Sequence, residues 1–109
     1  ESLKMLFLSY TDLDRQLPEK LIGRLTNLQE FDAMFSNIVG PIPSTVGLMT
    51  SLEWFNFWSN ELTGSVPSEL GLLKKLRFID VESNYLQGVI PDEFFQLSNL
   101  NTVYMGDNQ

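Results

Sequence analysis

The sequence predicts a repeat solenoid of the α/β class, in which successive coils of the chain lay short parallel strands side by side. Two observations predict this fold. First, the segment 52–75, LEWFNFWSNELTGSVPSELGLLKK, is matched position by position when the chain is shifted by 24 residues. Second, each copy carries the pattern Leu-x-x-Leu-x-Leu, whose alternating end is typical of a strand with one buried face. A repeat period of this length indicates a solenoid or a similar array.

Four whole copies of the repeat and the start of a fifth account for essentially the whole of residues 1–109. The two most regular copies lie in the second half, although Phe95 stands where the other copies have a second glycine. We expect a single array without capping domains, and, since the chain begins in mid-pattern without an initiator Met, a piece of a longer protein. The predicted repeats are 3–27, 28–51, 52–75, 76–99 and the partial 100–109.

A column of asparagines recurs after the predicted strands, at Asn60, Asn84 and Asn108. An amide side chain is both donor and acceptor, so it can satisfy backbone groups that are buried between coils. We therefore interpret this column as a structural ladder. Thr11 and Ser36 occupy the same position in the first two copies, and because a hydroxyl can do only part of this work, those coils should be looser.

After the Asn position, a proline recurs in each of the four whole copies, and a glycine in all but the first, where Arg15 replaces it. A glycine at this place indicates backbone with positive φ or a close approach of neighbouring chain. The proline that follows three residues later fixes φ and opens a short helical turn. The glycines of this column are Gly40, Gly64 and Gly88.

Composition excludes several classes of function. The net charge of −7 comes from 14 acidic and 7 basic residues, which disfavours nucleic acid and anionic membrane surfaces as partners. The chain has no Cys and no His, so it lacks disulfides, thiolate metal sites and the usual general base. No apolar run approaches the roughly 20 residues that cross a bilayer, and the first residues do not form a signal peptide. We expect no membrane insertion and no cofactor.

The segment 52–75 fits the pattern LxxLxLxxNxLxGxIPxxLGxLxx at every defined position, with Phe and Val replacing some aliphatic residues. It resembles the plant-type leucine-rich repeat. The resemblance implies a right-handed curved superhelix, with a parallel β-sheet on the concave face and 3₁₀ turns or short helices on the convex face. It also implies a second short strand around residues 62–66.

The resemblance further implies a binding protein that is not an enzyme. Similar domains occur in receptor-like kinases, in receptor-like proteins and in secreted inhibitors of polygalacturonases, so we expect an extracellular or cell-surface location. They bind peptides, proteins or hormones, and some act with a co-receptor. Their disulfide-linked caps and N-glycosylation sequons are absent from this sequence.

Ligand-binding residues are expected at the variable positions of the concave strands. These positions are acidic and aromatic, which indicates a protein or peptide ligand of basic character, because aromatic side chains ringed by charge are typical of binding hot spots. The alternative for the tryptophans is structural stacking along the sheet. The predicted set is Glu30, Asp32, Met34, Glu53, Trp54, Asn56, Trp58, Phe78, Asp80, Glu82 and Tyr104.

Catalysis and metal binding are not expected. Asp32 and Asp80 share a column two strands apart, about 10 Å from each other, which is just beyond the spacing of an inverting glycosidase. The surface should be open, with no pocket to shift a pKa. Calcium bound by these aspartates and Glu82 would need a tight ligand loop, which the sequence does not contain. We therefore predict no catalytic residue and no metal site.

The size of the face limits what it can bind alone. Five strands expose about 300–350 Å², well below the roughly 800 Å² that each partner contributes to a standard interface. We therefore predict a segment of a receptor-like ectodomain whose neighbouring repeats complete the site. The alternatives are a secreted inhibitor of a cell-wall-degrading enzyme and a purely structural solenoid. An ice-binding array would need repeated Thr or Asn columns, which the mixed positions do not supply.

Overall fold

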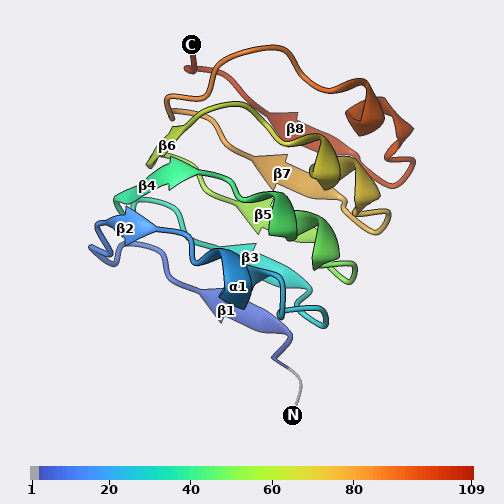
Figure 1. Cartoon of the computed structure of the whole chain (residues 1–109), viewed down its shortest axis with the longest axis horizontal. Helices are drawn as coiled ribbons and strands as arrows, with labels where there is room; N and C mark the ends of the chain where they lie inside the picture. The colour runs from blue at the N-terminus through green and yellow to red at the C-terminus, as the bar shows by residue number, and fades with distance from the viewer. Residues whose placement is uncertain (1–2) are drawn as a thin grey trace.

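The computed structural model describes residues 3–109 as a stack of coils that follow one another in chain order (Figure 1). Five short strands, one from each coil, form a wholly parallel sheet in the order β1-β3-β5-β7-β8. The predicted repeat solenoid with a parallel sheet is confirmed. The strands are β1 (Met5–Phe7), β3 (Glu30–Asp32), β5 (Trp54–Asn56), β7 (Phe78–Asp80) and β8 (Thr102–Tyr104).

A second, smaller parallel sheet lies beyond the Asn position and has the order β2-β4-β6. Within residues 76–99, the fourth coil has no regular strand here. Its backbone nevertheless continues the sheet, since the N–H groups of Tyr85 and Gln87 donate to carbonyls of the preceding coil. The strands are β2 (Arg15–Gln16), β4 (Ile38–Pro41) and β6 (Glu61–Thr63).

A short helical turn follows the proline of each of the first four coils and returns the chain to the next strand. The first turn is a single turn of α-helix, and the other three are 3₁₀ helices. Each has a proline in extended conformation at its N-cap, as expected from the fixed φ of that residue. The elements are α1 (Glu19–Ile22), η1 (Ser44–Leu48), η2 (Ser68–Leu72) and η3 (Asp92–Gln96).

The core runs through the stack between the sheets and the helical turns. The Leu-x-x-Leu-x-Leu positions of the second, third and fourth coils, such as Leu52, Phe55 and Phe57, are at most 2% exposed. The two phenylalanine rings stack on each other at 4.4 Å, and Phe31 of the preceding coil packs edge-on against both. Leu6 of the first coil is only partly buried, because it packs against a neighbouring coil on one side only.

The asparagines of the predicted ladder bind backbone groups of two coils at once. The Oδ1 atom of Asn60 accepts from the N–H groups of Ser36 and Ile38, both at 3.0 Å. Its Nδ2 group donates to the carbonyls of Ala33 and Phe57 at 2.9 and 3.0 Å. Asn60 is 8% exposed and its polar atoms are fully used. This amide therefore joins the second coil to the third.

The first two coils use other groups where an asparagine is missing. The hydroxyl of Ser36 donates to the carbonyl of Leu8 at 2.6 Å, and the N–H of Leu13 donates to the backbone carbonyl of Ser36 at 2.9 Å. The hydroxyl of Thr11 donates to the same Leu8 carbonyl. The backbone carbonyl of Ser36 thus accepts from Leu13 the hydrogen bond that the amide oxygen of Asn60 accepts from Ile38 one coil later.

Glycines are required at two kinds of position. The glycines that follow the Asn column have φ of 81°, 76° and 88°, as their place in the repeat predicts. On the other side of the stack, a Cβ added to Gly71 would lie 2.6 Å from the Cβ of Glu93 and 2.9 Å from its carbonyl oxygen. The helical turns of neighbouring coils therefore pack in direct backbone contact at this glycine.

Candidate ligand-binding face

The outward-facing side chains of the five-stranded sheet, here called the concave face, fall into columns set by the register of the strands. Each residue lies beside the equivalent residue of the next coil, as Glu30 lies beside Trp54 and Asp32 beside Asn56. The first column contains Met5, Glu30, Trp54, Phe78 and Thr102, and the second contains Phe7, Asp32, Asn56, Asp80 and Tyr104. The register therefore places the predicted residues of both columns on one face.

Aromatic side chains of three neighbouring coils form a continuous row on this face. The Trp54 and Phe78 rings are stacked, with centroids 3.8 Å apart and planes 7° from parallel. Phe78 in turn meets Tyr104 edge-on at 6.1 Å. Trp54 remains 38% exposed and Tyr104 48% exposed. Structural stacking, considered above as the alternative to ligand binding, thus exists at Trp54 but covers only part of its ring.

A second aromatic row lies where the chain turns away after the strands of the first three coils. Tyr10 and Phe35 are stacked at 5.4 Å, and Phe35 meets Trp58 edge-on at 4.9 Å. Tyr10 is 70% exposed and Phe35 is 43% exposed. The predicted set contains Trp58 but neither of the other two residues. Tyr10 and Phe35 are aromatic residues at variable positions of the repeat, and this feature of the sequence could have placed them in the predicted set.

The second column is tied together by hydrogen bonds between side chains. The hydroxyl of Ser9 donates to Oδ1 of Asp32 at 2.5 Å, and Nδ2 of Asn56 donates to Oδ2 of Asp32 at 3.3 Å. The Oδ1 atom of Asn56 accepts from the backbone N–H of Trp58 at 3.2 Å. These bonds fix the Asp32 carboxylate in one orientation on the face.

Asn56, which was predicted to bind ligand, is buried on this face. Its side chain is only 8% exposed, and its amide is engaged by Asp32, by Met34 and by the Trp58 backbone. The Nδ2 atom of Asn56 lies 3.6 Å from the sulfur of Met34 in the preceding coil. Asn56 therefore contacts the Asp32 carboxylate, and little of its own side chain is exposed.

Asp80 occupies the same column as Asp32, with Asn56 between them. Burial raises the pKa of the Asp80 carboxyl above its usual value, and the negative charge of Asp32 raises it further. A hydrogen bond of 3.0 Å from the backbone N–H of Glu82 acts in the opposite direction. The charge of Asp32 thus acts on the pKa of Asp80 within their shared column.

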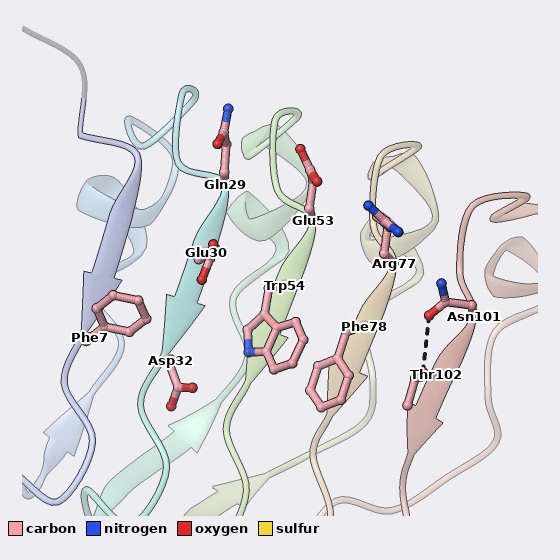
Figure 2. A pocket seen from close by; sticks show the side chains of 10 residues that line it. All are labelled: Phe7, Gln29, Glu30, Asp32, Glu53, Trp54, Arg77, Phe78, Asn101 and Thr102. Carbon is pink, nitrogen blue, oxygen red and sulfur yellow. Dashed lines mark hydrogen bonds between the residues drawn. The ribbon is translucent and has the colours of Figure 1, made fainter.

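A hollow of about 490 Å³ lies over the first column (Figure 2). The open face is thus hollowed at this place, where the aromatic rings of Phe7 and Trp54 lie on either side of β3. Of the predicted residues, the hollow is lined by Glu30, Asp32, Glu53, Trp54 and Phe78. It is also lined by five residues outside the predicted set: Phe7, Gln29, Arg77, Asn101 and Thr102.

The remaining predicted residues lie outside this hollow. They are Met34, Asn56, Trp58, Asp80, Glu82 and Tyr104, none of which belongs to its lining. Within residues 3–109, no group of three or more His, Cys, Asp or Glu side chains is arranged to hold a metal ion. No helix in the same range is long and apolar enough to span a bilayer.

The coils, their Asn and Gly columns and their variable outer strands define a class of solenoid scaffold. A sequence profile described as Leucine Rich Repeat matches residues 51–73 and 75–97. The chain belongs to the leucine-rich-repeat family, as its resemblance to the plant-type repeat predicted. A search of curated proteins gave no match.

Solved structures of plant receptors superpose on nearly the whole chain. The PEPR1–AtPEP1 structure is 32% identical over 98% of this chain, with a TM-score of 0.95, and a TDR receptor is 30% identical over 97%, with a TM-score of 0.94. The Arabidopsis receptor kinase HAESA, in complex with the peptide hormone IDA and the co-receptor SERK1, is 28% identical over 98%, with a TM-score of 0.90. The chain spans 15%, 18% and 18% of these three structures.

Proposed function

We propose that this chain forms part of a receptor-like leucine-rich-repeat ectodomain that binds a peptide or protein ligand outside the cell. The observation that carries the proposal is the likeness to receptor ectodomains solved with peptide ligands, among them HAESA with the peptide hormone IDA. The role proposed is recognition and not catalysis. Because the similar structures are receptors, they support this role over that of a secreted enzyme inhibitor.

The concave face is the proposed binding surface. It presents exposed aromatic rings, of which Trp54 and Tyr104 are 38% and 48% exposed, next to the carboxylates of Glu30, Asp32 and Glu53. Exposed aromatic residues with a charged surround are typical of binding hot spots. The charge of the chain, −7, favours a ligand with basic residues. We therefore propose a basic peptide or a basic segment of a protein.

Other surfaces complete the interface in this proposal. Five strands expose only about 300–350 Å² of concave face, whereas a stable complex uses about 800 Å² on each partner. Further repeats or a co-receptor would supply the remaining area. The HAESA structure contains the co-receptor SERK1, and the BIR3–SERK2 structure is a second complex that includes a chain of similar fold.

Selection from a displayed library of random peptides tests the proposal. Enriched peptides are expected to be basic, to bind more weakly as salt is raised, and to lose binding to a variant carrying Trp54→Ala and Trp58→Ala. A matched double variant on the second sheet, Glu61→Ala with Thr63→Ala, changes two exposed residues of another surface and should keep binding. Failure to enrich any peptide that depends on the two tryptophans would refute the proposed surface.

A further inference from the structure

We infer that the hollow on the concave face is a subsite for one arginine side chain of the ligand, held between Phe7 and Trp54 over the carboxylates of Glu30 and Asp32. The inference rests on the proposed function in that the arginine belongs to a bound peptide. It adds the chemical identity of one ligand residue and its place on the sheet.

The walls of the subsite are aromatic and lie two strands apart. Figure 2 shows Phe7 on one side of β3 and Trp54 on the other, with the indole nitrogen on the side of β3. One face of the Trp54 ring is covered by Phe78, and no other ring of residues 3–109 stacks on it. Phe7 is 60% exposed and lies outside both aromatic rows. A planar cation is therefore offered aromatic surface on two sides.

The floor of the subsite consists of two carboxylates, of which, within the described part of the chain, Asp32 is hydrogen-bonded to neighbouring side chains and Glu30 is not. Asp32 is held by the Ser9 hydroxyl and the Asn56 amide, so its position is fixed before a ligand arrives. The side chain of Glu30 forms no hydrogen bond or ion pair within residues 3–109. Glu30 lies in register between Met5 and Trp54, directly beside the indole. It is free to pair with a ligand cation that stacks on that ring.

Arginine fits this arrangement better than lysine. Its guanidinium group is planar, stacks on aromatic faces and presents donors in a fork that matches a carboxylate with two parallel hydrogen bonds. Lysine is a compact, strongly hydrated charge without a flat surface. A volume of about 490 Å³ also leaves room for the ligand backbone beside the guanidinium.

Arg77 defines which end of the hollow takes the cation. It lines the hollow on the side of β7, next to Asn101 and Thr102 of the last coil. Its positive charge opposes a second cation at that end, whereas the β3 end carries the carboxylates of Glu30 and Asp32. The charges of the hollow therefore direct the ligand arginine toward β3 and away from β7.

Titration with a small blocked peptide, acetyl-Gly-Arg-Gly-amide, tests the subsite without requiring a complete ligand. A Trp58→Phe background leaves Trp54 as the only tryptophan, so its fluorescence reports on the hollow directly. We expect a saturable change in emission, with binding about tenfold weaker for the citrulline peptide, which has the same shape without the charge. The lysine peptide should bind several-fold more weakly than the arginine peptide.

Two charge-matched variants locate the effect. Glu30→Gln should weaken binding of the arginine peptide about tenfold, whereas Glu61→Gln, the same change on the second sheet, should leave it within twofold. Circular dichroism melting checks that both variants are folded. Equal binding of arginine and citrulline peptides, tighter binding of lysine, or equal effects of the two glutamine variants would overturn the subsite.

The outcome separates this inference from the proposed function. Library peptides that depend on Trp54 and Trp58 but tolerate citrulline at every arginine would support the proposed function and overturn the subsite. Binding of the arginine tripeptide through Glu30, without any library peptide that depends on the two tryptophans, would support the subsite and count against the proposed function.

Discussion

Replacement of Asn84 by alanine is the sharpest test of how the coils are held together. Asn84 is 5% exposed and joins the third coil to the fourth. Its Oδ1 atom accepts from the N–H of Leu62 at 2.9 Å. Its Nδ2 group donates to the carbonyls of Phe57 at 3.0 Å and Val81 at 3.1 Å. Asn84→Ala removes all of these bonds at once.

The magnitude follows from what each partner retains after the change. The Phe57 carbonyl still accepts from Asn60 at 3.0 Å and the Val81 carbonyl from Asn108 at 2.9 Å, so each loses one of two bonds, worth about 1 kcal/mol. The Leu62 N–H loses the only partner it has in this network, and an orphaned buried donor costs about 1–3 kcal/mol. We expect Asn84→Ala to destabilise the fold by about 3–5 kcal/mol.

Urea and thermal unfolding measure this difference. A loss of this size should lower the melting temperature by roughly 12 °C or more, since a domain of about 100 residues shifts by about 4–8 °C per kcal/mol. The matched control is Glu82→Ala, two residues away, whose carboxylate forms no hydrogen bond within residues 3–109 and whose loss should change stability by less than about 0.5 kcal/mol. Equal melting shifts for the two variants would contradict the reasoning.

Three further predictions follow from other contacts. Gly71→Ala should destabilise the fold by about 1–3 kcal/mol in urea unfolding, because the added Cβ meets Glu93 backbone at 2.9 Å, whereas alanine at the exposed Ser68 should change little. Asp80→Asn should raise the free energy of unfolding at neutral pH, because the fold favours the neutral form of the Asp80 carboxyl, whose pKa is raised above 3.8. The stabilising contribution of Asp80 is present below the unfolded pKa and is lost as pH rises through the folded pKa. The advantage of the asparagine variant should therefore shrink as unfolding is measured at falling pH, and an advantage independent of pH would contradict this. Binding of a basic ligand selected on the concave face should weaken between 0.05 and 0.5 M salt, roughly, because surface charges are screened over about 10 Å at 0.1 M; unchanged affinity would refute the basic character of the ligand.

The repeating positions were predictable because each is set by a requirement that recurs in every coil. Asn84 must satisfy the backbone of its own and the preceding coil, and Gly64 must adopt φ of 76°. Because the fold fixes the identity of such a residue in every coil, the residue recurs at a regular spacing that can be read from a single sequence. The register of the strands follows from the same period, which is why the columns of the concave face were also predictable.

The depth of the concave face was not predictable in this way. Asn56 and Trp54 both point outward from β5, but one is 8% and the other 38% exposed. Their difference depends on the size of side chains from neighbouring coils, such as Met34 beside Asn56 and Phe78 beside Trp54. The hollow arises in the same way, from large residues on either side of smaller ones. These are relations between coils and are not visible in any one repeat.

The backbone conformation at Tyr10 and Phe35 shows that the fold does not require aromatic residues at these positions. Tyr10 and Phe35 have φ of 62° and 53°, in the left-handed region that costs a non-glycine residue about 1–2 kcal/mol. The later coils adopt the same conformation with smaller polar residues, Ser59, Ser83 and Asp107. The turn therefore does not need an aromatic ring, and the stacking of Tyr10 on Phe35 at 5.4 Å offsets only about 0.5–1.5 kcal/mol. Exposed rings held at such positions fit a binding role on this edge of the face better than a structural one.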